Sequence, residues 1–223
     1  MPKYDFAHPQ FKQSNIIIRY LRIRPGENTA STKDDALNLY DAKNVIVDHC
    51  SVELAPWNNF GGSSDNADYR VTGITVQNSL IANPIGQQFG AHIESTDGTW
   101  AWYYNAFVNT HNRNPLDKIN DIFVNNILYN FEAGYTTHTS AKFKHDIVNN
   151  YFVYGPEGKN EWFQVDKNQS IYANGNLIDK NRDGVLNGGP TSIYYYQGPG
   201  EEPKNPWNEL TTKGPMLSAA SAW

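Results

Sequence analysis

The stretch "HNRNPLDK", residues 111–118, brings two cations close together on either side of a proline. Arg113 presents a planar guanidinium that can bind a carboxylate through two parallel hydrogen bonds, and Lys118 presents a compact ammonium. Pro115 restricts the backbone between them, and Asn112 adds an amide beside the arginine. These residues could hold an acidic ligand, although a solvated loop with two ordinary cations would have the same composition.

A second polar cluster, "DKNRDGVLN" at residues 179–187, partly matches a calcium-binding loop. Asp179, Asn181, Asp183 and Gly184 stand at positions 1, 3, 5 and 6 of an EF-hand loop. The twelfth position is Pro190, so the bidentate glutamate that completes such a site is absent. We therefore favour a turn rich in Asp, Asn and Gly over a metal site.

The histidines and the remaining carboxylates indicate no further site. Four of the six histidines, His92, His111, His138 and His145, have no metal-ligand spacing, and we expect these four at turns or on the surface. Glu53 and Glu94 could be imagined as the carboxylate pair of a glycoside hydrolase, but nothing in their spacing singles them out.

Composition excludes several classes of protein. The 223 residues carry a net charge of −5 and contain no run of Lys and Arg, so we expect no nucleic-acid binding. No run of eighteen apolar residues is present, so no helix is expected to span a membrane. Cys50 is the only cysteine, which excludes an intrachain disulfide. A polyanionic ligand would need a local cationic patch or a bridging metal ion.

The elements that must position these residues repeat along the chain. Short apolar runs recur with a small or polar residue interrupting each one, at intervals in the twenties. The interrupting residues are Leu21, Cys50, Asn78, Asn105, Asn126, Asn150 and Asn176. A period of this length with strands and no helical stripe is typical of a β-solenoid. The alternative is a β-sandwich with scattered Asn turns.

The repeated Asn residues predict a feature of the core. In a solenoid, residues at one phase stack from coil to coil, so each side-chain amide can bond to the next and satisfy its polar atoms at a bend. The segments at about 28–43, 55–70 and 84–99 are expected to protrude as loops, since the early intervals are longer. We expect one domain over residues 1–223, with coils at about 15–187 and an irregular strap at 188–223.

Three stretches together resemble the pectate lyase family. "NIIIRYLRIRPGE" at 15–27 is similar to the family's Asn-Val-Ile-Ile-Arg-Asn-Leu coil, and "DALNLYDAKNVIVDHCSVE" at 35–53 resembles its Asp-His-Cys-Ser stretch. "RNPLDK" at 113–118 resembles the Arg-x-Pro-x-x-Arg motif. The resemblance covers about residues 15–180. It implies an all-β, single-stranded right-handed parallel β-helix that lacks the family's first coils.

The resemblance also implies roles for the residues. Pectate lyases cleave polygalacturonate by β-elimination, and the first motif arginine, here Arg113, is assigned as the base. The second motif arginine falls on Lys118, which would hold the substrate carboxylate together with Asn112 and Pro115. Lysine keeps the charge but loses the two-pronged geometry of arginine.

Calcium is the cofactor that the resemblance implies. Asp35 stands where the family supplies one ligand, and Asp65 and Asp68 lie near the place of the family's acidic pair. Carboxylate oxygens in a loop suit calcium. The acidic pair is not at its usual spacing, and a lysine of the family falls near Gly86, so that cation is missing.

The resulting prediction is a calcium-assisted pectate lyase that acts on an acidic polysaccharide. We expect a monomer that works outside the cell, although residues 1–4 contain no apolar core of a signal peptide. One alternative is a β-helix that binds acidic polysaccharide without cleaving it. Another is a glycoside hydrolase on the same fold.

Overall fold

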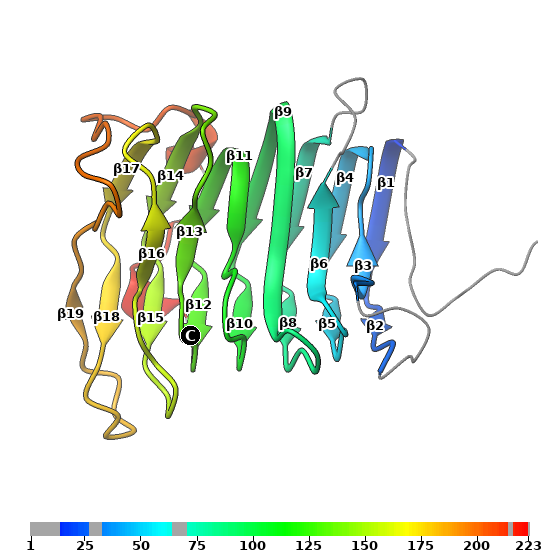
Figure 1. Cartoon of the computed structure of the whole chain (residues 1–223), viewed down its shortest axis with the longest axis horizontal. Coiled ribbons are helices and arrows are strands. Elements are labelled where there is room, and N and C mark those ends of the chain that lie inside the picture. Colours follow the sequence, from blue (N-terminus) through cyan, green and yellow to red (C-terminus); the bar gives the residue numbers. More distant parts are fainter. Residues whose placement is uncertain (1–13, 27–32, 64–70, 214–215, 223) are drawn as a thin grey trace, which may run out of the picture.

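The computed structural model describes residues 14–26, 33–63, 71–213 and 216–222. Parallel strands stack coil upon coil along one long axis (Figure 1). Regular pairing joins them into an 11-stranded and an 8-stranded sheet. The prediction of a parallel β-helix is therefore confirmed, and the β-sandwich alternative is wrong. Within the described residues, no helix is both long and apolar enough to cross a membrane.

The 11-stranded sheet bends around the coil and forms two of its sides, because its longest strands run from one side to the other. We call each of these sides a face of the solenoid. We call one the back face; its strands are β1 (Ser14–Arg19), β4 (Lys43–Asp48), β7 (Thr72–Gln77), β9 (Phe89–Tyr103), β11 (Leu116–Val124), β14 (Lys144–Val148) and β17 (Ser170–Asn174). The other, the front face in Figure 1, consists of β3 (Leu37–Asn38), β6 (Asn58–Ser63), the first parts of β9 and β11, β13 (Tyr135–Thr137) and β16 (Trp162–Val165).

The 8-stranded sheet, which we call the short-strand sheet, closes the coil. Its strands are β2 (Arg22–Ile23), β5 (Ser51–Glu53), β8 (Leu80–Ala82), β10 (Ala106–Val108), β12 (Ile127–Tyr129), β15 (Tyr151–Val153), β18 (Leu177–Asp179) and β19 (Gly189–Pro190). Among the described strands of this sheet, only β19 pairs in the antiparallel direction, against β18. One short α-helix, α1 (Leu210–Lys213), and one 3-10 turn, η1 (Ala219–Ser221), follow.

Alternation along the strands builds the core. In β4, Val45 and Val47 are fully buried whereas Ile46 between them is exposed, as expected for side chains that point to opposite faces of a strand. The register pairs Val47 with Val76 of β7, so each inward residue meets its counterpart one coil away. Large aromatic side chains fill the middle coils; they include Phe60, Trp100, Trp102, Phe107, Phe123 and Tyr135.

A ladder of buried side chains runs along the bend after the back face. The Nδ2 atoms of Asn105, Asn126 and Asn150 each donate to the Oδ1 of the next Asn, at 3.0–3.1 Å. The Asn ladder is thus confirmed. One position was wrong: Ser79, not Asn78, belongs to it, because the backbone N–H of Ser79 donates to Asn105 Oδ1. The inward residue of that coil is accordingly Ile81, not Leu80.

The alignment was wrong by one residue in this coil because the residue just before a ladder position is often also an Asn. Asn78 has a φ of 49°, and Asn125 and Asn149 are both at 54°. The bend needs a left-handed backbone there, which Asn tolerates better than most residues. Two Asn columns thus lie next to each other, and a sequence alignment on Asn alone cannot separate them.

The expectation of protruding loops in the first coils also needs correction. Residues 84–99 do not form a protruding loop, because β9 begins at Phe89. Residues 37–38 and 58–63 are likewise strands of the front face, while 27–32 and 64–70 lie outside the described residues. Glycines and polar residues on the outer side of these strands hide the alternation in the sequence.

The segment after Gly188 reaches the back face, where Trp207 and Thr211 contact Asp146.

Candidate active site on the front face

Arg113 lies in the connection between β10 and β11, and neighbouring coils hold its backbone firmly. Its φ is 60°, and its N–H donates to Asn112 Oδ1 at 2.6 Å. Its carbonyl accepts the N–H of Ala91 at 2.8 Å. The peptide bond between Asn114 and Pro115 is cis. The fully buried side chain of Asn114 donates to the carbonyl of Ala133. The loop is therefore built into the coil stack rather than freely solvated.

The guanidinium of Arg113 is oriented by one hydrogen bond and one aromatic face. Its Nη1 donates to Asn58 Oδ1 at 2.9 Å, and its Cζ lies 3.9 Å from the ring centroid of Phe89. Trp57 packs edge-on against Phe89. Stacking on an aromatic face stabilises a cation and fixes its plane. Burial lowers the pKa of Arg113, while the nearby Asp35 opposes this.

Asp35 lies behind Asn58 and completes a chain of three side chains. Its Oδ1 accepts the backbone N–H of Asn58 at 3.2 Å and the Asn58 side-chain amide at 2.7 Å. Its Oδ2 accepts from Asn38 at 3.1 Å. Burial raises the pKa of Asp35 to about 6, although the hydrogen bonds from Asn58 and the charge of Arg113 act in the other direction. Asn58 thus links this carboxyl group to the guanidinium.

The surroundings of Asp35 fit part of a calcium site. Asn38 Oδ1 is buried and has no hydrogen-bond partner within the described structure, although Asn38 Nδ2 bonds to Asp35. An orphaned oxygen beside a desolvated carboxyl group is a donor set that suits a hard cation. The described residues contain no group of three or more His, Cys, Asp or Glu side chains that could hold a metal. Asp65 and Asp68 lie outside the described residues.

Lys118 lies on the same face, in β11, and is paired. Its Nζ lies 3.1 Å from Glu94 Oε2, which is also 3.2 Å from His92 Nε2. The parallel register places Lys118 directly beside Glu94 of β9. The hydrogen bond from His92 and the neighbouring Lys118 lower the pKa of Glu94 to about 2. Burial, together with Arg113 and Lys118, lowers the pKa of His92, so we take this imidazole as neutral at pH 7.

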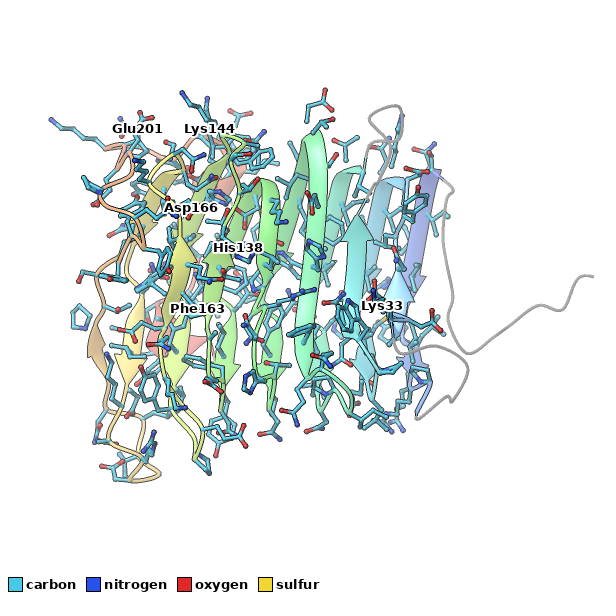
Figure 2. The ribbon with its side chains drawn as sticks, in the orientation of Figure 1. Lys33, His138, Lys144, Phe163, Asp166 and Glu201 are labelled. Carbon is cyan, nitrogen blue, oxygen red and sulfur yellow. The ribbon has the colours of Figure 1, made fainter. Side chains whose placement is uncertain are left out.

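His138 extends the site toward the later coils. Burial and the charge of Lys118 lower its pKa, and its Nδ1 lies 3.5 Å from Thr136 Oγ1. Figure 2 shows His138 on the front face, with Phe163 and Asp166 beyond it and Lys33 toward the other end. A row of polar and aromatic side chains therefore crosses successive coils, as a site for a linear polymer requires.

The other sequence candidates lie away from this face. Glu53 bonds to Arg24 at 2.6 Å on the short-strand sheet, so Glu53 and Glu94 are not a converging carboxylate pair. The turn at 179–187 uses its carboxylates internally: Asp183 Oδ1 accepts the N–H of Val185, and Asp179 Oδ2 that of Asn187. A groove of about 910 Å³ lies elsewhere, at the bend lined by Tyr20, His49 and Tyr104.

The expectation that all four histidines lie at turns or on the surface is wrong for His145. This side chain is fully buried in β14, where Nδ1 lies 2.6 Å from Asp121 Oδ1 and 2.8 Å from the hydroxyl of Tyr135. Burial lowers its pKa to about 4. The inward direction follows from the strand register, which a lone histidine in the sequence does not reveal.

Sequence reasoning missed several residues of the site, among them Asn38, Asn58, Phe89, His92 and Glu94. Asn58 and Phe89 carried no signal, because their partner Arg113 is 55 and 24 positions away in the sequence. Glu94 could be found only through the register that pairs it with Lys118.

Comparison with known proteins supports the sequence resemblance. No family model matches the chain. A protein from Aspergillus flavus named "Probable pectate lyase C" is 33% identical over 183 residues, which cover 80% of this chain and 42% of that protein. A protein of the same name from Aspergillus fumigatus is 35% identical over 178 residues, covering 78% of this chain and 41% of its own length.

These findings define the class of protein. The chain is a parallel β-solenoid, and its resemblance to pectate lyases is confirmed over about four fifths of its length. It spans about two fifths of the curated relatives that it matches. The same name recurs in relatives from Aspergillus oryzae and Aspergillus terreus, at 32% and 31% identity.

Proposed function

We propose that this chain forms the catalytic part of a polysaccharide lyase that cleaves polygalacturonate by β-elimination with the help of calcium. The observation that carries the proposal is the fixed chain of Asp35, Asn58 and Arg113 on the front face, in a protein similar to pectate lyases over most of its sequence. The polymer would lie across successive coils, next to Lys118 and His138.

Arg113 would remove the proton from C5 of a galacturonate residue. The electrons of that C–H bond form the C4–C5 double bond, the bond from C4 to the glycosidic oxygen breaks, and the leaving oxygen receives a proton from solvent. An arginine is ordinarily protonated in proteins. Burial of the guanidinium, which lowers the pKa of Arg113, supports the role of proton acceptor.

Lys118 would bind the carboxylate beside the C5 proton. Charge develops on that group in the transition state, so a fixed cation lowers the barrier. Asn58 would orient the guanidinium through its 2.9 Å hydrogen bond, because a small misplacement of a reacting group is costly. Asn112 and Pro115 would shape the loop between the two cations.

Calcium would be held by Asp35 and by the orphaned Oδ1 of Asn38, and Asp65 and Asp68 remain proposed ligands. The ion would neutralise substrate carboxylates and lower the cost of the negative charge that forms at C5. The polysaccharide substrate implies work outside the cell, and a coil stack that fills its own core is consistent with a monomer.

The test is the ultraviolet absorbance of the unsaturated product. Wild-type protein is incubated with polygalacturonate and calcium, and we expect absorbance to grow, to stop on addition of a chelator, and to fall at least a hundredfold for Arg113→Ala. Asn109→Ala, on the exposed bend after β10, is the control that keeps full activity. Activity that persists in Arg113→Ala would remove the arginine from the mechanism.

A non-catalytic polysaccharide-binding protein is the second candidate. The pairing of Lys118 with Glu94 favours it, because this cation already has a carboxylate partner. Retention on a pectate gel without any unsaturated product would support this candidate over the lyase.

A further inference from the structure

Glu94 is paired with Lys118, the cation that is proposed to hold the substrate. Its Oε2 lies 3.1 Å from Lys118 Nζ, within the range of a charge-assisted hydrogen bond. The carboxyl group of glutamate and that of a uronic acid are the same chemical group. A uronate that binds Lys118 therefore competes with Glu94 for the charge and the three N–H donors of one ammonium group.

Glu94 stays ionised and keeps its place at working pH. His92 Nε2, at 3.2 Å, and Lys118 lower its pKa to about 2. Because one carboxylate oxygen contacts both neighbours, the group that leaves Lys118 still has the imidazole of His92 as a partner. Displacement by another carboxylate therefore does not leave Glu94 without a hydrogen-bond partner.

The two side chains differ in their exposure. The Glu94 side chain is 45% exposed, whereas that of Lys118 is 19% exposed. The carboxylate is thus the more solvent-exposed partner, and the ammonium is the more enclosed one. They lie on neighbouring strands β9 and β11, on the face that carries Arg113.

We propose that Glu94 is a specificity-determining residue that competes with substrate carboxylate for Lys118. The inference rests on the proposed function and adds to it the kind of polymer that the front face prefers. Glu94 weakens the binding of fully ionised polyuronate, because a like charge is already paired with the ammonium of Lys118 at this subsite. A residue that carries a methyl ester at this subsite leaves the Glu94–Lys118 pair in place and meets no such competition.

The experiment compares Glu94→Gln with Glu209→Gln, which removes the same charge from the exposed pair with Lys213 on the strap. Binding of a short oligogalacturonate is measured by calorimetry in an Arg113→Ala background, where no turnover occurs. We expect Glu94→Gln to bind about three- to tenfold more tightly and Glu209→Gln to bind as before. Binding of a fully methyl-esterified oligomer should change less than twofold in either variant.

Two further measurements separate competition at Lys118 from general charge repulsion. In a Lys118→Ala background the gain from Glu94→Gln should shrink to less than twofold, because the contested cation is gone. In the active protein, Glu94→Gln should lower KM for polygalacturonate and leave kcat within about twofold.

The outcomes distinguish failure of the proposed competition at Lys118 from failure of the proposed lyase function. A wild-type protein that cleaves polygalacturonate, with a Glu94→Gln variant that binds no more tightly, overturns this inference alone. Equal gains from Glu94→Gln and Glu209→Gln, or a full gain without Lys118, also overturn it. A protein that neither cleaves nor binds the polymer overturns the proposed function and this inference together.

Discussion

At the scale of single residues, burial and hydrogen bonding set the charge of each group on the front face. Asp35 and Glu94 are both carboxyl groups, yet burial raises the pKa of the first to about 6 while His92 and Lys118 lower that of the second to about 2. The two acids therefore differ in their response to pH. Glu94 remains a carboxylate throughout the physiological pH range, whereas Asp35 gains or loses its proton close to that pH range.

The pKa of Asp35 predicts how calcium should act on stability. Because the folded-state pKa is raised from 3.8 to about 6, the stabilising contribution of this group is complete below about pH 4 and is lost as pH rises through 6. The calcium ion proposed at Asp35 would bind the ionised form, so it should offset that loss at high pH and compete with the proton at low pH. We expect added calcium to raise the melting temperature more at pH 8 than at pH 5.

The control for this prediction is Asp35→Asn, which removes the titrating group and should abolish the difference between the two pH values. Melting curves with calcium, with magnesium and with a chelator provide the measurement. Equal shifts at both pH values in the wild type would show that Asp35 is not a ligand.

At the scale of elements, the Asn ladder joins neighbouring coils at the bend after the back face through buried side-chain hydrogen bonds. Asn126 accepts the N–H of Asn105 at 2.9 Å and donates to the carbonyl of Trp102 at 3.0 Å, and it is fully buried. Each such amide satisfies backbone groups that the bend removes from the sheets. Loss of one amide therefore leaves several buried polar atoms unpaired.

Asn126→Ala should lower the free energy of unfolding by about 2–4 kcal/mol, because it leaves buried donors and acceptors unsatisfied. Asn130→Gly, in the more exposed Asn row after β12, keeps the left-handed backbone of 56° free of strain and removes a 2.9 Å bond to Asn109 and a 2.8 Å bond from the N–H of Glu157, both of which water can replace. We expect its cost to be below about 1 kcal/mol. Urea unfolding of both variants checks the difference, and equal costs would contradict a special role for the buried ladder.

At the scale of the whole molecule, residues 207–211 of the segment after β19 cover part of the outer side of the back face. Trp207 packs near Ala101, Ile122, Val124 and Val148, and its Nε1 donates to the carbonyl of Asp121 at 3.0 Å. Asp146 accepts from the N–H groups of Trp207 and Asn208 and from the hydroxyl of Thr211. The front face, with Arg113 and Lys118, remains on a different side of the coil.

Trp207→Ala should therefore separate stability from activity. The lost packing and hydrogen bond should lower the free energy of unfolding by about 2–3 kcal/mol, less than for a fully buried tryptophan. The rate of product formation per folded molecule should stay within about twofold. A large fall in kcat at a temperature where the variant is folded would show that the strap influences the front face.

The sequence by itself determined the class of fold, most of the inward residues of the short-strand sheet and the position of the central cation in the chain. Repeated apolar runs with a common interval require neighbours to cover each apolar side, and buried amides at a bend require partners, so the solenoid and its ladder follow from local pattern alone. Even so, Asn78 and Ser79 could not be told apart, because both a left-handed bend and a ladder accept small polar residues. The resemblance to pectate lyases singled out Arg113 and Lys118 by motif.

Only the tertiary structure decided which side chains meet these cations. Asn58 reaches Arg113, and Glu94 reaches Lys118, because parallel register brings together residues that lie a coil or more apart in the sequence. The same stacking buries His145 and raises the pKa of Asp35 by removing water from the carboxyl group. Register and desolvation depend on the whole stack of coils, so no local stretch of the chain encodes them.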